Sequence, residues 1–132
     1  MTIVVGYAPS TQGRAALRAG ARYAARGGSP LLIAAHQHAV PGGGTTAATE
    51  EEVRAELEGL GASLEGVTVR RGPDREIGEF LLSTIEEVQA ELVVIGLRRK
   101  SPIGKLNLGA SARRVVLGAP CPVLTVKDDD AA

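Results

Sequence analysis

The stretch LVVIGLRRKSPIGKLNLGASARRVVLGAPCPVLTV, residues 92–126, contains a complete strand–helix–strand unit. Its ends, residues 92–95 and 123–126, are largely apolar runs of the length expected for buried strands. Between them, a segment from about Gly109 to Gly118 has a helical pattern, with its adjacent valines facing inward. Strands joined through a helix usually lie parallel in one sheet. This stretch therefore predicts an α/β fold.

The same alternation of apolar runs and helical periodicity continues through the rest of the chain. Thr49 followed by Glu52 matches a capping box, which places a helix start there. Asp74 is the expected cap of the next helix. The predicted strands cover 3–5, 31–35, 67–69, 92–95 and 123–126, and the predicted helices contain the apolar stripes Leu17–Ala24, Val53–Leu64 and Ile77–Val88 and the segment 109–118.

Five strands alternating with four helices predict repeated βαβ units, and hence an α/β five-stranded parallel sheet covered by helices on both faces. The continuous apolar runs fit strands that are buried on both sides. We expect one domain over residues 1–127, followed by a disordered acidic tail at 128–132. The glycine-rich segment 41–49 is predicted to be a flexible surface loop.

The charge balance excludes broad classes of partner. Fifteen lysines and arginines oppose fifteen aspartates and glutamates, so no net field attracts the chain to nucleic acid or a membrane. No apolar run approaches the roughly 20 residues that span a bilayer. The lone Cys121 excludes an intrachain disulfide and suits a reducing compartment. We therefore expect a soluble cytoplasmic protein without a signal peptide.

The turn after the first strand identifies no cofactor by itself. Open α/β sheets bind ligands beyond the carboxyl ends of their strands, where the strand order reverses. The segment GYAPSTQGR (6–14) contains neither a dinucleotide-binding glycine motif nor the acids of a receiver domain. Its Ser10–Gly13 part is weakly similar to a flavin phosphate loop. Tyr7, Tyr23 and Phe80 are the only aromatic residues, which argues against a flavin site.

The loop after the fourth strand is strongly basic. Four lysines and arginines lie between Gly96 and Ser111, with no acid among them. The loop is not a P-loop, because Arg99 and Leu106 stand where that motif needs a glycine and a serine or threonine. It leads into a helix N-terminus, whose free amides and dipole attract anions. The sequence therefore favours a phosphate site here, with a solvated basic loop as the alternative.

Three segments together resemble the universal stress protein family: TIVVGYAPSTQGRAALRAGARYA (2–24), ELVVIGLRR (91–99) and LGASARRVVLGAPCPVLTV (108–126). The terminal APCPVLTV and the Gly96–Gly109 spacing are the most specific parts of this resemblance. It implies a Rossmann-like sheet of the adenine-nucleotide-binding type, with strand order 3-2-1-4-5. It also implies ATP as a common ligand and, often, a homodimer.

The family's ATP motif is only partly matched. Gly96 and Gly109 fit its first and third glycines, whereas Arg99 replaces the second. Ala110 stands where serine or threonine follows the third glycine, with Ser111 one place later. A guanidinium at the second position could pair with phosphate through two hydrogen bonds. The resemblance therefore implies a phosphate site that departs from the usual pattern.

Ala8 stands where many members of the family have an aspartate after the first strand. A methyl group accepts no hydrogen bond, and losing a buried charge-assisted contact costs about 1.5–3 kcal/mol. Two functions therefore remain open. In the first, a non-catalytic regulatory protein of the stress response binds ATP, another adenine nucleotide or a similar phosphorylated ligand between the first and fourth strands. In the second, the protein has lost ATP binding and acts through homodimerisation and protein–protein contacts. The expected nucleotide-binding residues are Ala8, Gln37, Ile95, Gly96, Arg98, Arg99, Gly109, Ala110 and Ser111.

Nucleic-acid binding, metal binding and catalysis are not expected. A neutral chain with few aromatics has little to hold and stack bases. No carboxylate lies between Gly96 and Gly109 to hold Mg²⁺ or activate water, so any ATP hydrolysis would be slow and incidental. His36 and His38 could share a metal, but a third ligand is missing and ordinary strand-end histidines are favoured.

The last strand predicts a homodimer. Pro120 and Pro122 lack amide donors, which suits a strand that enters at the edge of a sheet. The apolar strand 123–126 that follows would leave a hydrogen-bonding edge open. We expect two copies of the chain to meet through this fifth strand.

Overall fold

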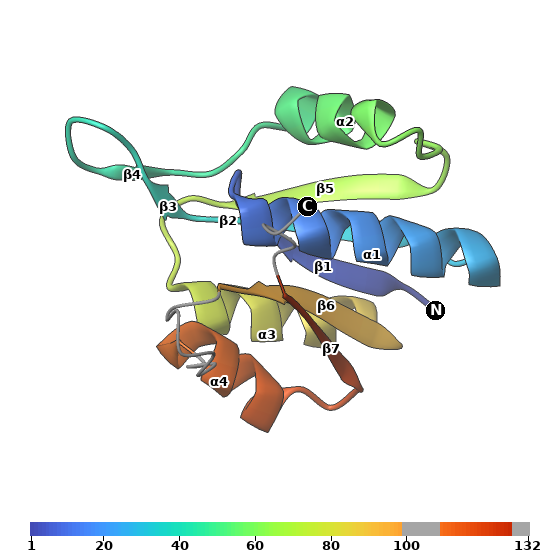
Figure 1. Ribbon diagram of the computed structural model, residues 1–132. Helices are drawn as coiled ribbons and strands as arrows, with labels where there is room; N and C mark the ends of the chain where they lie inside the picture. Colours follow the sequence, from blue (N-terminus) through green and yellow to red (C-terminus); the bar gives the residue numbers. More distant parts are fainter. Residues whose placement is uncertain (99–108, 128–132) are drawn as a thin grey trace.

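A computed structural model describes residues 1–98 and 109–127 of the chain (Figure 1). The basic segment 99–108 and the predicted tail at 128–132 lie outside these ranges. The strands are β1 Ile3–Tyr7, β2 Leu31–His36, β3 His38–Ala39, β4 Thr45–Thr46, β5 Val67–Gly72, β6 Leu92–Leu97 and β7 Val123–Lys127, and the helices are α1 Thr11–Gly27, α2 Glu50–Gly59, α3 Ile77–Val88 and α4 Ala110–Gly118.

The main sheet has five parallel strands in the order β5-β2-β1-β6-β7. Counting only these strands along the chain, this is the predicted order 3-2-1-4-5. The central strand β1 pairs Ile3 with Leu31 of β2 on one side and with Leu92 of β6 on the other. Because β1 continues to β2 while β6 begins the other half of the sheet, the strand order reverses between β1 and β6.

Successive residues of each strand point to opposite faces, and each face carries its own core. Val5 of β1 packs with Leu17 of α1 and Leu57 of α2 in one cluster. Val4 packs with Ile85 of α3 and Val115 of α4 in the other. Figure 1 shows the same division, with α1 and α2 across the sheet from α3 and α4. No described helix has the length and apolarity to cross a membrane.

The helix caps confirm one prediction and correct another. Thr49 and Glu52 form the expected capping box at the start of α2, each side chain bonded to the other's amide. Asp74 does not cap α3, because the chain is still turning there, with the Arg75 amide 3.5 Å from the Gly72 carbonyl. Glu76 is the cap: its carboxylate accepts the amides of Gly78 and Glu79. Its longer side chain can fold back over the first turn.

The segment 41–49 contains a hairpin turn that the sequence analysis did not predict. Gly42, Gly43 and Gly44 all have positive φ and reverse the chain. The residues on either side form a small antiparallel hairpin, in which β3 pairs with β4. Positive φ at consecutive positions is accessible to glycine without steric cost, so the three glycines can form the turn of the hairpin.

Val116 does not face inward as predicted, and Leu64 lies outside its predicted helix. Val116 is 39% exposed, whereas its neighbour Val115 is fully buried. Adjacent residues of a helix point about 100° apart, so only one of them can face the sheet. Helix α2 ends at Gly59, and Leu64 packs against the core from the loop that follows.

Candidate functional site

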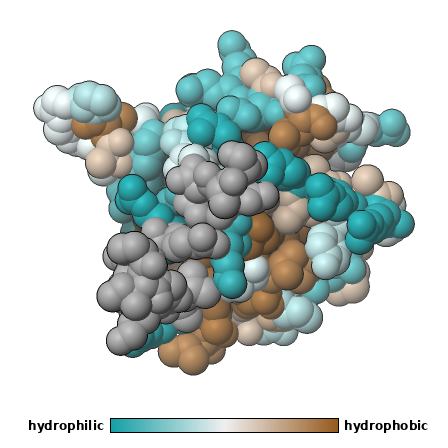
Figure 2. Space-filling model, viewed as in Figure 1, coloured by the Kyte–Doolittle hydropathy of each residue, from teal (hydrophilic) through white to brown (hydrophobic). Residues whose placement is uncertain are grey.

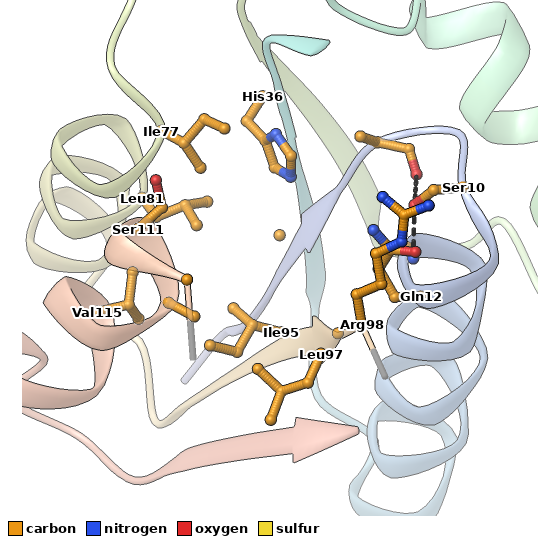
Figure 3. A pocket seen from close by; sticks show the side chains of 16 residues that line it. Ser10, Gln12, His36, Ile77, Leu81, Ile95, Leu97, Arg98, Ser111 and Val115 are labelled. Atoms are coloured by element: carbon orange, nitrogen blue, oxygen red, sulfur yellow. Dashed lines mark hydrogen bonds between the residues drawn. The ribbon is translucent and has the colours of Figure 1, made fainter. Parts of the chain in front are cut away.

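A cavity of about 240 Å³ opens where the strand order reverses, at the carboxyl ends of β1 and β6 (Figure 3). This is the place where open α/β sheets bind ligands. Parts of six elements and the turn after β1 surround it. The lining residues come from β1 and its turn (Gly6, Ala8), α1 and its cap (Ser10, Gln12, Gly13), β2 (His36), α3 (Ile77, Leu81), β6 and the residue after it (Ile95, Gly96, Leu97, Arg98) and α4 and its cap (Gly109, Ser111, Ala112, Val115).

Most of the residues predicted from the sequence meet at this cavity. Those that line it are Ala8, Ile95, Gly96, Arg98, Gly109 and Ser111. Gln37 and Ala110 are not among the lining residues, although each is a neighbour of one. Arg99 belongs to the segment 99–108, which the structure does not describe.

His36 lines the cavity, as expected from its place at the end of β2, while two further polar lining residues, Ser10 and Gln12, were not predicted. Ser10 is the N-cap of α1, and its hydroxyl accepts the amide of Gly13 at 3.0 Å. A serine three residues before a glycine, at the start of a helical pattern, is a recognisable cap signal in the sequence. No signal in the sequence places Gln12 on the cavity side of that first turn.

The N-termini of three helices, α1, α3 and α4, reach the cavity, since Ile77 is the first residue of α3. Helix α3 has Glu76 as its cap and Glu79 in its first turn, whereas α1 and α4 have no acidic residue in their first turns. The cap of α4 is Gly109, which makes no side-chain hydrogen bond to the helix. A helix N-terminus carries a partial positive charge, and acids in the first turn would neutralise it. The cavity is therefore electropositive at two places before Arg98 is considered.

The two outer glycines have different structural roles. A Cβ at Gly96 would overlap the backbone of Gln12, because β6 passes directly against the first turn of α1. Within residues 1–98 and 109–127, nothing lies within 4 Å of a Cβ at Gly109, whose φ of −62° suits any residue. Gly96 is thus required by packing, while the described part of the chain leaves the space at Gly109 open for a ligand.

The side chain of Ser111 is hydrogen-bonded within the protein. Its hydroxyl donates to Glu76 Oε2 at 3.3 Å, and Arg114 Nη1 lies 2.8 Å from Glu76 Oε1. The amides of Gly78 and Glu79, followed by Ser111 and Arg114, hold the pKa of Glu76 below its ordinary value. The phosphate-binding hydroxyl expected from the sequence is therefore turned toward a carboxylate on α3.

The side chain of His36 points into the cavity from the end of β2 (Figure 3). Its Nδ1 lies 3.0 Å from the carbonyl oxygen of Gln37. Burial, more than any other influence, lowers the pKa of this imidazole. It is therefore neutral at physiological pH.

The cavity wall is divided by polarity. Ile77, Leu81 and Ile95 form an apolar side, while Arg98 lies across the opening near Ser10 and Gln12 (Figure 3). No aspartate or glutamate is among the described lining residues. No cluster of three potential metal ligands occurs in residues 1–98 and 109–127. The arrangement suits a ligand with a flat apolar part and an anionic part.

Comparison with known proteins identifies the family. The model of the universal stress protein family matches residues 1–127. The chain belongs to the universal stress protein family. The universal stress protein of Mycolicibacterium smegmatis (strain ATCC 700084 / mc(2)155) is 37% identical over 128 residues, which cover 95% of this chain and 96% of the relative.

Solved structures of universal stress proteins share the fold. A universal stress protein from Archaeoglobus fulgidus superposes with a TM-score of 0.71 at 29% identity, covering 96% of this chain and 98% of the other. A structure of the universal stress protein from the same organism in complex with dAMP gives a TM-score of 0.66 at 25% identity, with the same coverage of both chains.

Proposed function

We propose that this universal stress protein binds an adenine nucleotide in the cavity between β1 and β6. The phosphates would lie between the N-termini of α1 and α4, and the base against the apolar side formed by Ile77, Leu81 and Ile95. One observation carries the proposal: two helix N-termini free of first-turn acids, together with Arg98, border a cavity with one apolar side. The dAMP complex of the Archaeoglobus fulgidus relative supports it.

Each predicted residue has a stated part in this proposal. Gly109, Ala110 and Ser111 would present the first amides of α4, and Gly96 would keep β6 packed against the first turn of α1 beside the phosphates. Arg98 would neutralise charge, and the proposal gives Arg99 the same role. Ala8 and Gln37 would border the nucleoside. ATP is one candidate ligand within this class.

The proposed role is regulatory rather than catalytic, in the stress response and in the cytoplasm. Phosphoryl transfer to water needs a group that holds Mg²⁺ or activates the attacking water. The described lining residues of the cavity include no carboxylate that could do either. Any hydrolysis of bound ATP would therefore be slow and incidental to binding.

Calorimetric titration with ATP, ADP, AMP and cyclic AMP tests the proposal. We expect binding that weakens as salt rises, because exposed charges are screened. Gly109→Val fills the open space before α4 and should abolish binding without unfolding the protein. Gly59→Val is the matched control, because Gly59 ends α2, has open space around it in the described structure and does not line the cavity.

The outcomes separate the two functions left open by the sequence. Heat with at least one nucleotide, lost in Gly109→Val and kept in Gly59→Val, supports nucleotide binding. Absence of heat with all four ligands, on a folded protein, refutes it. That result would favour the alternative, a protein that acts through homodimerisation and protein–protein contacts. The bond between Ser111 and Glu76, together with the methyl group of Ala8, is the observation in favour of this second candidate.

A further inference from the structure

The polar groups of the cavity differ in what they can offer a ligand. Arg98 and the helix amides are donors only. The Ser10 hydroxyl accepts from Gly13, and the Gln12 side-chain oxygen accepts from Thr11. His36 differs from all of these, because the structure gives its Nε2 no hydrogen bond within residues 1–98 and 109–127.

The contact at Nδ1 determines what Nε2 can do. A carbonyl oxygen only accepts hydrogen bonds, so His36 Nδ1 must carry the proton that it shares with Gln37. In a neutral imidazole the other nitrogen then has a free lone pair. Because burial keeps His36 neutral, Nε2 is an acceptor at physiological pH.

The position of His36 Nε2 in the cavity indicates which part of a ligand it would meet. It is the ring atom farthest from the backbone, and the ring points inward beside Ile77 (Figure 3). It therefore lies on the apolar side, across the cavity from Arg98 and the cap of α1.

We propose that His36 is a specificity-determining residue, whose Nε2 accepts a hydrogen bond from an amino or hydroxyl group on the nucleoside part of the ligand. This inference rests on the proposed function. Ala8 borders the same cavity and offers only a methyl group and its backbone, so the imidazole supplies a side-chain acceptor that position 8 lacks.

Nucleotide analogues that each lack one donor test the inference and identify the group. The probes are AMP, purine riboside 5′-monophosphate without the amine, and the 2′- and 3′-deoxy forms of AMP. Wild type should bind one of the three analogues about tenfold more weakly than AMP, which corresponds to about 1.4 kcal/mol. In His36→Leu, AMP and that analogue should bind equally.

Two further variants provide the controls. His36→Gln places an amide oxygen near the position of Nε2 and should restore part of the discrimination. His38→Leu changes the nearby histidine, which does not line the cavity, and should leave the discrimination between AMP and the analogue unchanged. The inference is wrong if wild type binds AMP and His36→Leu still discriminates between AMP and each analogue as wild type does. The proposed function would then stand.

The tautomer can be measured without any ligand. Nitrogen-15 spectra of the histidine side chains in the free protein should show His36 with the proton on Nδ1 and none on Nε2. A proton on Nε2 at neutral pH would overturn the inference whatever the protein binds. A failure of every nucleotide to bind, with Nε2 unprotonated, would instead overturn the proposed function and the ligand class with it.

Discussion

At the scale of single residues, Gly96 and Gly109 show how one sequence motif can combine two unrelated requirements. Gly96 is fixed by packing, since any side chain there would meet the backbone of α1. Gly109 has an ordinary φ and open space among the residues that the structure describes, which therefore do not require glycine at that position. Of the two, only Gly109 leaves space that a ligand could fill.

Gly96→Ala should therefore destabilise the protein. The added methyl group must displace β6 from the first turn of α1, and such overpacking costs about 1–3 kcal/mol or more. Gly109→Ala should lower the midpoint of urea denaturation less, because it meets no described atom and only replaces glycine by a poorer helix cap. Equal stability of the two variants would contradict the roles assigned to these glycines.

Much of the site could be predicted from residue types, but contacts between elements could not. Gly96, Gly109 and Arg98 were found because glycines and cations stand out between a strand and a helix. The acceptor role of His36 depends on the carbonyl of Gln37, and the state of Ser111 depends on a carboxylate 35 residues earlier. Sequence spacing does not reveal which distant side chains share a hydrogen bond.

At the scale of secondary-structure elements, Glu76 links two helices. It caps α3 through the amides of Gly78 and Glu79, and it holds Ser111 and Arg114 of α4. The apolar stripe of α3 was correctly predicted from its spacing. Its cap was assigned to Asp74, because short acids are the usual capping residues.

Glu76→Ala should lower stability and strengthen nucleotide binding. Loss of the cap should cost about 1 kcal/mol. Release of the Ser111 hydroxyl and removal of a negative charge should raise affinity for ATP by roughly three- to fivefold, as expected for an exposed charge. Thr49→Ala, which removes the cap of α2, is the control. It should lower stability by a similar amount and leave the affinity for ATP unchanged. Equal affinity of Glu76→Ala and wild type for ATP would contradict the link.

The same carboxylate predicts a dependence of stability on pH. The folded protein lowers the pKa of Glu76 below the ordinary value of 4.5. Glu76 therefore contributes stability that is fully present above pH 4.5 and is lost as pH falls through its lower, folded pKa. Thermal melts from pH 7 to pH 2.5 should show a smaller acid-induced fall in Glu76→Gln than in wild type. Parallel curves for the two proteins would argue against this contribution.

At the scale of the whole molecule, the two edges of the sheet are β5 and β7. Apolar surface gathers in the lower half of Figure 2, where Figure 1 places β7 and α4. Val116 and Leu117 of α4 are 39% and 80% exposed. An open strand edge beside exposed apolar side chains favours association with another strand.

We predict a homodimer that forms through β7, measurable by light scattering over a range of concentrations. Thr125→Asp places a charge on this strand, where it would face its own copy across a two-fold axis, and should shift the protein toward monomer. Thr68→Asp is the control, since Thr68 is also exposed and lies on the opposite edge strand β5. A wild-type protein that remains monomeric at high micromolar concentration would contradict this prediction.

Helix α4 begins at a glycine that supplies no side-chain cap, so its first turn gains most from an anion held there. A nucleotide that binds only the folded chain, at 100 times its Kd, adds about 2.7 kcal/mol to the free energy of unfolding. Resistance to proteolysis would then rise with occupancy. The lifetime of the protein in a cell would follow the nucleotide concentration around it.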